Sequence, residues 1–542
     1  MAMAAQRPEV FTRRASGLVR VMSPYSAFVY NILTMGLIFP WTYLWAPGAL
    51  PGGNLFWGIV FAMVLEIPIA LAYVWLSTAL PRSGGDYVFQ SRVFGGGIGF
   101  SIVMSGFVIW ILQWVALSGW LLAYLGFAPL FLGLGATVHS AAMTSLGLWF
   151  TSPWGIFITS IANALIALLL LVSGFKNYVR FQHVMWIATL LAFAIMLVVL
   201  FGTTPQSFAD KMNSFVVASG GQPNFYQTAL SAAKAKSIDL APPFSLMATL
   251  LVAPIAWTSL QWASYSAQQN GEIKNARSFR SQMIIIIGSL VVTGILLAIL
   301  AAAFEHAIGT DFLYVAGAGY WSGLSEGTFN GVYLWPNIVA MAIAQHPLVV
   351  LLIGIGYILN SFQIVNNCYI GMTRVMVAMS LDRLLPEWVS RVSDRLHTPV
   401  NAHIAYFIAS IPVIILYDFW GQWTALTLGV TFACGYVFVV TALAGALLPY
   451  RAKALYDASP GAHYTIGGLP AVTVIGGVGA VVGAIMVLMF IFYDAFGLTS
   501  ALARNVVIGV LIVSIVWYWL AKFMQKSRGI DVGFAFKEIP PE

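Results

Sequence analysis

Long apolar stretches alternate with short polar segments along the whole chain. An α-helix needs about 20 mostly apolar residues to cross the hydrocarbon core of a bilayer. A membrane β-barrel would instead show segments of about ten residues with alternating hydrophobicity. The pattern therefore predicts an all-α polytopic membrane protein. We expect twelve crossings, at about 25–46, 55–80, 98–126, 154–173, 181–202, 244–268, 282–304, 347–379, 400–417, 422–448, 469–493 and 503–523.

The composition excludes a soluble protein. Of the 542 residues, 60% are hydrophobic and 8% are charged, and the mean hydropathy is +0.87. A typical globular domain carries about 25% charged residues. The net charge of +7 does not indicate a nucleic-acid partner, because the basic residues follow the loops between crossings. Cys368 and Cys434 lie inside apolar stretches and are expected to pack there, since a disulfide framework or a metal site needs more ligands at closer spacing.

The basic residues also predict the orientation in the membrane. Of the 25 Lys and Arg residues, all but Lys211, Lys234, Lys236 and Arg504 fall in the two tails and in every second loop. Cytoplasmic loops are enriched in Lys and Arg. We therefore expect a protein of the cytoplasmic membrane with both termini in the cytoplasm.

No segment is long enough to form a separate soluble domain. We expect one transmembrane domain over 25–523, between cytoplasmic tails at 1–24 and 524–542. Two longer external segments, about 203–243 and 305–346, are expected to form caps or short interfacial helices.

Two crossings contain helix breakers near the middle of the membrane. The first holds Thr34, Gly36 and Pro40, and the sixth holds Pro254 followed by the polar residues Thr258, Ser259 and Gln261. Unpaired backbone groups are tolerated at that depth only where protein or a water-filled cavity satisfies them. Breaks in corresponding helices of two halves indicate a substrate site, although each alone is also compatible with an ordinary proline kink.

Such a break suits a zwitterion. Exposed N–H groups at the start of a half-helix bind a carboxylate, and exposed carbonyl groups at the end of the other half accept hydrogen bonds from an ammonium. The backbone alone can therefore hold the constant part of an α-amino acid.

Three loop sequences resemble signatures of the amino acid–polyamine–organocation (APC) superfamily of permeases. They are LPRSGGDYVFQSRVFGG from Leu80, NGEIKNARSFRSQ from Asn270, and TRVMVAMSLDRLLPEWVSRVSDRLHTPVNA from Thr373. All three fall in the predicted cytoplasmic loops, in the family's order, and the C-terminal tail is similar to that of archaeal members. The resemblance implies alternating access, amino acids or related amines as substrates, and a five-plus-five inverted-repeat fold. The repeats would cover about 25–202 and 244–448, with trailing helices at about 469–523.

The resemblance also points to substrate-binding residues in the two broken helices. The family's first-helix signature starts with Gly-x-Gly, and here the first of these glycines is a threonine. The family's aromatic gate falls within about one residue of Trp257, which is otherwise an interfacial or core tryptophan. Ser259 and Gln261 would read the substrate side chain or would satisfy the broken helix. The candidate residues are Asn31, Ile32 through its carbonyl, Thr34, Trp257, Ser259 and Gln261, together with Met35 and Gly36, which would offer backbone N–H groups to a carboxylate.

Two mechanisms of ion coupling are compatible with the sequence. The fifth helix holds no lysine of the kind that some proton-coupled relatives carry. Thr189, Asn366 and carbonyls of the first helix offer oxygen ligands that suit sodium. Glu66 lies in the middle of the second crossing, and an intramembrane carboxylate indicates a functional site, here a proton carrier. Its alternative role is a structural hydrogen bond to another helix or to backbone freed by Pro68. We favour the proton over sodium.

The cytoplasmic motifs supply Gly84, Gly85 and Tyr87, and four charged residues are candidates for an ion-pair network that gates the cytoplasmic side. These are Asp86, Glu272, Arg374 and Asp382, whose alternative is to be solvated loop charges.

The leading function is secondary active transport of amino acids, coupled to an ion. A membrane enzyme would need a nucleophile with its base or paired intramembrane carboxylates, and the sequence shows neither. A sensor or subunit of a larger complex would carry an added domain. A polyamine or other organic cation is the alternative substrate, but it would favour carboxylates near the breaks. We expect no cofactor and no metal beyond the sodium option, and the partners are a small-molecule substrate (an amino acid), the coupling ion (proton or sodium) and the lipid bilayer.

Overall fold

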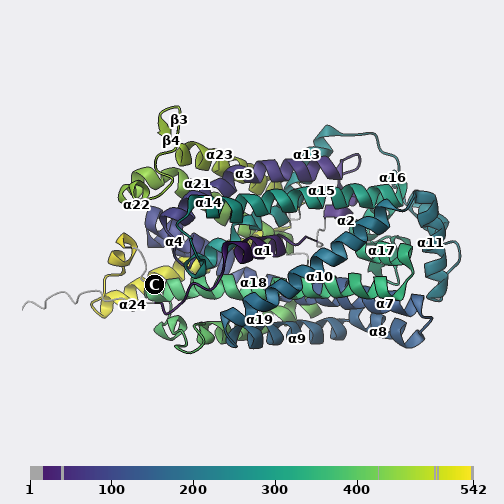
Figure 1. Ribbon diagram of the computed structural model, residues 1–542, viewed down its shortest axis with the longest axis horizontal. Coiled ribbons are helices and arrows are strands. Elements are labelled where there is room, and N and C mark those ends of the chain that lie inside the picture. Colours follow the sequence, from purple (N-terminus) through teal and green to yellow (C-terminus); the bar gives the residue numbers. More distant parts are fainter. Residues whose placement is uncertain (1–15, 38–41, 425–426, 494–495, 497–499, 539–542) are drawn as a thin grey trace, which may run out of the picture.

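The computed structural model describes residues 16–37, 42–424, 427–493, 496 and 500–538. The described chain is an elongated bundle of helices that run roughly along its long axis (Figure 1). Eleven helices in this part of the chain are long and apolar enough to cross a membrane. They match the predicted crossings two to twelve in order, so the all-α polytopic fold is confirmed.

Eight of these crossings are single helices: α3 (Leu55–Ala79), α9 (Pro153–Val172), α10 (Phe175–Phe201), α18 (Pro347–Leu381), α19 (Val400–Phe419), α21 (Thr427–Arg451), α23 (Ala471–Phe492) and α24 (Ala501–Ser527). Three crossings consist of several consecutive helical segments. The third comprises α5 (Gly96–Val103), η1 (Met104–Ile109), α6 (Ile111–Leu121), η2 (Leu122–Phe127) and α7 (Ala128–Thr137). The sixth comprises α13 (Leu246–Leu260) and η3 (Gln261–Glu272), and the seventh comprises α14 (Phe279–Gln282), η4 (Met283–Gly288) and α15 (Ser289–Ile308). Segments η1, η2 and η4 are π-helical turns, and η3 is a 3-10 helix.

The remaining elements are short. They are α1 (Pro24–Met35), α2 (Thr42–Ala49), α4 (Gly85–Phe94), α8 (Ala141–Thr151), α11 (Pro205–Ala218), α12 (Phe225–Ala235), α16 (Thr310–Trp321), α17 (Pro336–Ala344), α20 (Gly421–Thr424), α22 (Lys453–Asp457), η5 (Ser325–Gly327), η6 (Glu387–Ser390) and η8 (Val532–Lys537). Strands β1 (Thr328–Phe329) and β2 (Val332–Tyr333) form one two-stranded antiparallel sheet, and β3 (Thr465–Ile466) and β4 (Leu469–Pro470) form another. The two long segments predicted as caps contain α11, α12, α16 and α17.

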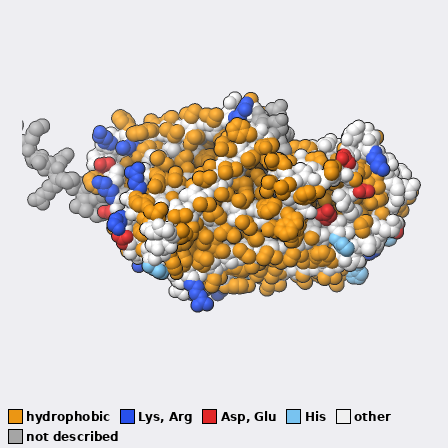
Figure 2. All heavy atoms as spheres, turned by 90° about the horizontal axis from the view of Figure 1, so that it is seen from above, with side chains coloured by type: hydrophobic (Ala, Val, Ile, Leu, Met, Phe, Trp, Pro, Cys, Tyr) orange, Lys and Arg blue, Asp and Glu red, His pale blue; other side chains and the backbone are white. Residues whose placement is uncertain are grey.

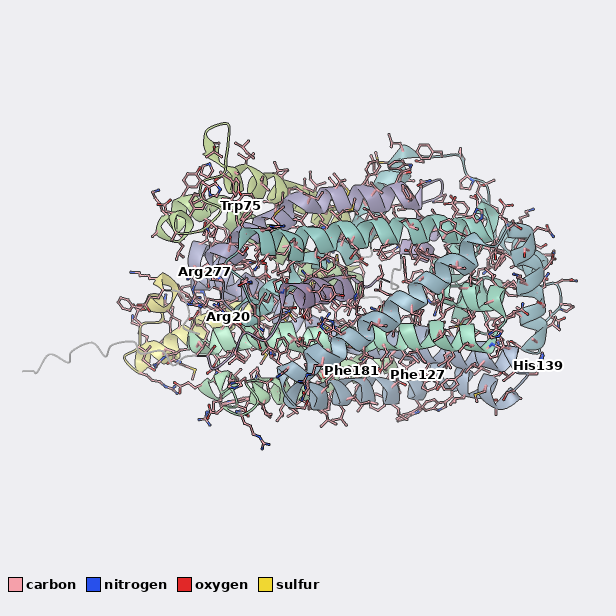
Figure 3. All side chains as sticks on the ribbon, viewed as in Figure 1. Arg20, Trp75, Phe127, His139, Phe181 and Arg277 are labelled. Carbon is pink, nitrogen blue, oxygen red and sulfur yellow. The ribbon has the colours of Figure 1, made fainter. Side chains whose placement is uncertain are left out.

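Charged side chains on the visible face lie mainly toward the two ends of the bundle (Figure 2). Hydrophobic side chains cover most of the long middle of this face. Arg20 and Arg277 lie at one end and His139 at the other (Figure 3). The loops that carry the three motifs share the end with Arg20, because the Gly84 N–H donates to the Gln268 carbonyl at 2.8 Å and the Met22 N–H donates to the Glu272 carbonyl at 3.0 Å. We call this end the motif end.

The first crossing is broken where the sequence predicts. Helix α1 starts at an N-cap, Ser23, whose hydroxyl accepts from the Ser26 N–H at 3.0 Å. It ends at Met35 because Gly36 turns the chain into the left-handed region, with φ 80°, where glycine has no side-chain penalty. The chain resumes as α2 at Thr42, and the expected breaker Pro40 lies outside the described residues.

The sixth crossing breaks elsewhere than predicted. Pro254 lies inside α13, which continues as an α-helix to Leu260, and the geometry changes to 3-10 at Gln261. The expectation of a break at Pro254 is therefore wrong. A proline inside a membrane helix is tolerated where neighbouring groups satisfy the freed backbone, and α13 continues past Pro254. Further along, in η3, the Ser266 N–H donates to the side-chain oxygen of Asn31 at 2.9 Å. A side chain of α1 thus bonds directly to the backbone of η3.

Close helix packing depends on glycine at particular contacts. A methyl group on Gly476 of α23 would lie 2.7 Å from the Ala442 carbonyl oxygen and 2.7 Å from the Ala446 nitrogen of α21, whereas a methyl group on the adjacent Gly477 would meet no described atom within 4 Å.

We predict that Gly476→Val lowers the free energy of unfolding by about 1–3 kcal/mol, because it forces α21 and α23 apart. Gly477→Val is the matched control and should change it by no more than about 0.5 kcal/mol. Thermal unfolding of the two purified variants in detergent measures the difference. Equal losses in both variants would show that this helix contact is not tightly packed.

Candidate functional site

A cavity lies where the two broken crossings meet. Its lining comes from α1, α6, α13, η3 and α18, and comprises Thr34, Met35, Ile111, Trp114, Thr258, Ser259, Trp262, Tyr265, Ile364, Asn367 and Cys368. None of these described lining residues carries a charge. The C-terminal ends of α1 and α13 both reach this cavity.

Aromatic rings form one wall of the cavity. The Trp262 ring of η3 lies 5.7 Å from the Trp114 ring and 5.2 Å from the Tyr265 ring, both in edge-on arrangements, and 6.0 Å from Phe107. Edge-to-face pairs of this kind hold aromatic side chains in fixed orientations. The wall is therefore built from η3 and from the third crossing.

The opposite side of the cavity carries a chain of polar side chains. The Asn367 amide donates to the Thr34 hydroxyl at 2.6 Å, and the Thr34 hydroxyl donates to the Tyr30 carbonyl at 2.6 Å. The Asn367 oxygen accepts from the Gln363 amide at 2.6 Å and from the Tyr178 hydroxyl at 3.1 Å. This network joins α1, α10 and α18 at the α1 break.

Only part of the predicted substrate set lines the cavity. Thr34, Met35 and Ser259 do. Gly36 and Ile32 do not, and they bond to each other, because the Gly36 N–H donates to the Ile32 carbonyl at 3.0 Å. In this conformation the two backbone groups that we assigned to the carboxylate and the ammonium of the substrate satisfy one another.

The other predicted residues hold the breaks in place. The buried Asn31 donates through Nδ2 to the Ile285 carbonyl at 3.0 Å, while its Oδ1 accepts from the Ser266 N–H. Gln261 is buried outside the cavity lining, and its amide donates to the Thr258 carbonyl at 3.4 Å. In this conformation the Gln261 side chain bonds to the helix backbone, and a role in reading the substrate stays a prediction.

Trp257 and Glu66 contact each other. The Trp257 indole N–H donates to Glu66 Oε2 at 2.6 Å, and both side chains are fully buried. Glu66 Oε1 has no hydrogen-bond partner among the described residues. Trp257 therefore contacts α3 and does not line the cavity, whereas Trp262 does. The hydrogen bond ties α3 to α13 directly beside the cavity residues Thr258 and Ser259.

The two residues proposed for a sodium site lie apart. Helices α10 and α18 pack with Tyr178 against Asn367, and with Ala188 and Ala192 against Gly356. Thr189 is thus level with Gly356 of α18. Gly356 and Asn366 are ten residues apart on α18, so Thr189 and Asn366 are separated by about 15 Å along the helix axis, at 1.5 Å per residue. In this conformation the antiparallel register of the two helices separates Thr189 from Asn366, and a shared sodium site stays a prediction.

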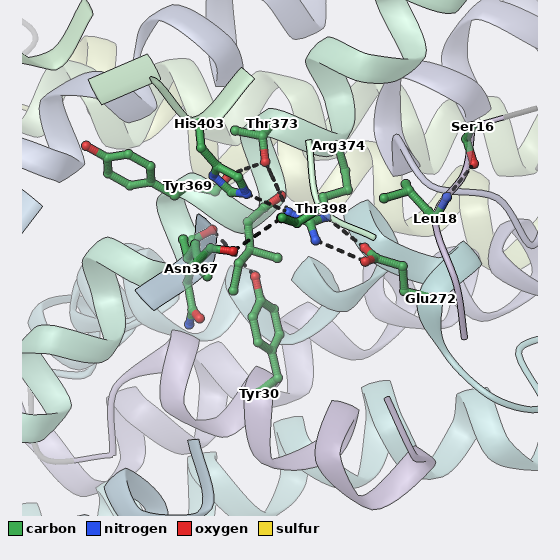
Figure 4. Close-up of polar contacts among 12 residues, drawn as sticks. Ser16, Leu18, Tyr30, Glu272, Asn367, Tyr369, Thr373, Arg374, Thr398 and His403 are labelled. Carbon is green, nitrogen blue, oxygen red and sulfur yellow. Dashed lines mark hydrogen bonds and ion pairs between the residues drawn. The ribbon is translucent and has the colours of Figure 1, made fainter. Parts of the chain in front are cut away.

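Two buried ion pairs hold the motif end together. Arg374 of α18 donates to both carboxylate oxygens of Glu272 at 2.7 and 3.0 Å, and to His403 Nε2 at 3.2 Å (Figure 4). Arg92 of α4 donates to both oxygens of Asp382 at 2.6 and 3.1 Å. Bidentate geometry of this kind makes strong, directional pairs. These charges are buried, so the alternative of solvated loop charges does not apply to them.

Asp86 and the motif residues beside it complete this end. The Asp86 carboxylate accepts hydrogen bonds from Tyr73, Gln268 and Thr441, which belong to α3, η3 and α21. It forms no ion pair among the described residues, in contrast to the network that we expected. Burial raises the pKa of Asp86 from 3.8 to about 6, against the lowering effect of its hydrogen-bond donors. Tyr87 donates to Asp382 at 2.7 Å.

Gly84 and Gly85 allow this close assembly. Gly84 has φ 101°, a conformation that other residues rarely adopt. A methyl group on Gly85 would lie 2.6 Å from the Gln268 side-chain oxygen and 2.9 Å from the Ala267 carbonyl group. The two glycines of the motif thus let α4 start against η3.

Comparison with known proteins places the whole arrangement in a family. The family model described as amino acid permease matches residues 25–513. The chain belongs to the amino acid permease family. It is therefore a multi-pass membrane protein of this family. A stretch of 83 residues, 15% of the permease, is also 34% identical to uncharacterized protein 399 of Sulfolobus islandicus rod-shaped virus 1, of which it covers 21%.

Several residues of the site escaped sequence reasoning. Trp262, Tyr265 and Trp114 of the permease line the cavity, Asn367 rather than Asn366 faces it, and Arg92 is the partner of Asp382. Gln363 and Asn367 are four residues apart and share one helix face, which is a signal that the sequence did carry. No local pattern distinguishes the aromatic residues from the other tryptophans and tyrosines of the chain.

We predict that the stability of the permease falls as the pH rises through about 6, because of Asp86. The folded chain holds the Asp86 proton more tightly than the unfolded chain, so this contribution is fully present below about pH 4 and is lost above the folded pKa of about 6. It amounts to roughly 3 kcal/mol. Asp86→Asn should remove this part of the pH dependence in thermal unfolding between pH 4 and pH 7.5.

Asp457→Asn is the control for this experiment, because Asp457 forms an exposed ion pair with Lys453 at 3.0 Å. It should keep the slope of the unmodified permease. A slope that is the same in Asp86→Asn and in the unmodified permease would contradict the assignment.

Proposed function

We propose that this permease is a secondary active transporter that moves amino acids with neutral side chains across the cytoplasmic membrane by alternating access. The observation that carries the proposal is the cavity at which the breaks of the first and sixth crossings meet. Carriers built from inverted repeats place their substrate between such broken helices. The corresponding breaks also support repeats over about 25–202 and 244–448, with trailing helices at about 469–523.

The electrostatics of the cavity support a zwitterion. The carbonyl end of a helix carries a partial negative charge, and the C-terminal end of α1 reaches the cavity, where the 3-10 helix η3 continues from α13. The α1 end favours the substrate ammonium, while hydroxyl and amide groups of Ser259 and Asn367 are candidates to bind the carboxylate. The aromatic wall of Trp262 and Tyr265 suits an apolar or small neutral side chain. A polyamine remains the alternative substrate, but the described lining offers no carboxylate for a second cationic group.

The proposed orientation places the motif end in the cytoplasm, with both termini there. Arg20 and Arg277 lie at this end, and the positive-inside rule assigns such residues to the cytoplasmic side. The buried pairs Arg374–Glu272 and Arg92–Asp382 would then join α18 to η3 and α4 on the cytoplasmic side. Opening toward the cytoplasm requires these contacts to separate, which is the role of a gate.

The proposed coupling ion is a proton carried by Glu66. Its carboxyl group is fully buried in the second crossing, and Oε1 has no partner among the described residues. Oε2 accepts from Trp257, which precedes the cavity residue Thr258. Protonation of Glu66 would weaken this hydrogen bond and so free α13 next to the substrate.

The transport proposal predicts concentrative uptake in proteoliposomes. With an inward proton gradient and no sodium, we expect accumulation of a few related neutral amino acids from a labelled panel. Asn367→Ala should raise the KM by at least about tenfold, since it removes a polar group from the cavity. Asn366→Ala is the matched control, because Asn366 is buried but does not line the cavity. Uptake of polyamines instead of amino acids would overturn the substrate assignment.

The coupling proposal predicts that Glu66→Gln abolishes the dependence of uptake on the proton gradient while substrate binding persists. A glutamine keeps the size and a hydrogen-bond acceptor for Trp257 but cannot exchange a proton. Counterflow of labelled substrate at equal pH on both sides measures the retained activity. Uptake that still follows the gradient in Glu66→Gln would show that the proton moves elsewhere.

A further inference from the structure

A second cavity lies on the outside of the bundle at the motif end, away from the substrate site. It has a volume of about 580 Å³ and separates α24 from the segment that follows α18. Arg383 and Arg528 lie at its polar end, and Val513, Val516 and Leu520 line its apolar part. This volume is within the range of ordinary ligand pockets.

The walls of this cavity are fixed by hydrogen bonds. The Trp517 indole N–H donates to the Leu384 carbonyl at 3.3 Å, and the Gln525 amide donates to the Arg383 carbonyl at 3.0 Å. Arg383 itself has φ 63°, an unusual conformation for a residue with a side chain. Two side chains of α24 thus hold the backbone of the opposite wall, and a ligand would meet a preformed site.

The charged and apolar residues of the lining occupy different positions along the axis of α24. Helix α24 runs from Ala501 to Ser527, and Arg528 follows its last residue at the motif end. From Arg528 to Ile512 the lining extends over about 24 Å of helix, which exceeds the ~15 Å depth of one leaflet. Only 17% of the apolar window of α24 is buried within the described chain. The cavity therefore opens along a surface that faces lipid.

The distribution of charge argues against a second copy of this chain as the occupant. In a two-fold symmetric contact the same surface lies on both sides. Helix α24 contains no Asp or Glu, so two copies packed through α24 would bring Arg528 near like charges without an acidic partner from that helix. An occupant with an anionic head and an apolar tail has no such conflict.

We propose that this cavity is a binding site for one anionic phospholipid, with its phosphate between Arg383 and Arg528 and an acyl chain along Val513, Val516 and Leu520. Basic pockets between helices at the cytoplasmic side of a membrane bind anionic headgroups in this way. Arg383 follows Asp382, the partner of Arg92. The bound lipid therefore lies beside the ion pair that joins α18 to α4.

The test is native mass spectrometry of the delipidated full-length permease titrated with phosphatidylglycerol or phosphatidylcholine. We expect one phosphatidylglycerol per chain to bind in preference to phosphatidylcholine. The double variant Arg383→Gln/Arg528→Gln should weaken that binding roughly thirtyfold, since each basic residue near an anionic headgroup contributes on the order of fivefold. Lys526→Gln is the matched control, because Lys526 is an exposed residue of the same helix end that does not line the cavity.

A third variant tests the apolar part without changing charge. Val516→Trp fills the acyl groove and should also abolish the preference, while thermal unfolding establishes that each variant is folded. An equal loss of phosphatidylglycerol binding in Lys526→Gln and in the double variant would contradict the proposed site. It would show that the lipid is attracted to basic surface residues in general. Displacement of the lipid by inorganic phosphate alone would assign the site to a free anion. Dimers that dissociate in Val516→Trp would assign it to a second copy.

Discussion

The side chain of Asn31 satisfies the backbone at the place where two crossings stop being regular helices. It donates to the Ile285 carbonyl and accepts from the Ser266 N–H. Inside a membrane an unpaired backbone group costs several kcal/mol, so a helix can break there only if such partners exist. One amide side chain with both a donor and an acceptor serves the sixth crossing and the start of the seventh at once. The cavity between the broken crossings depends on this contact, because the open space exists only while the breaks are stable.

The polar groups of the structure form two separate systems. Around the cavity, neutral amides and hydroxyls join α1, α10 and α18, centred on Asn367. At the motif end, full charges pair inside the protein, as in Arg374–Glu272 and Arg92–Asp382. Neutral hydrogen bonds exchange partners at modest cost, which suits a surface that must receive and release a substrate. Buried ion pairs cost several kcal/mol to break, so these two pairs hold α18 firmly against η3 and α4.

Glu66 belongs to neither of these two polar systems. It is a carboxyl group in the second crossing whose partner, Trp257, is a neighbour of the cavity residues. Sequence reasoning selected both residues for separate reasons, as a proton carrier and as an aromatic gate. Their hydrogen bond instead makes them one unit that links α3 to α13. Trp262, five residues further along, lines the cavity instead, because residues five apart on a helix point in different directions.

The amino-acid sequence by itself determined the architecture. Hydrophobic length gave the crossings, Gly36 gave the first break, and charged residues in three motifs identified the end where Arg374, Glu272 and Asp382 gather. These features are local, since they depend on helix length, backbone freedom and the cost of charge in lipid. Only the tertiary structure decided which residues meet. The register of α10 against α18 separated Thr189 from Asn366 and brought Asn367 to Thr34, and Arg92 met Asp382 across 290 residues of chain. Such pairings follow from how helices pack, and no pattern within one helix contains that information.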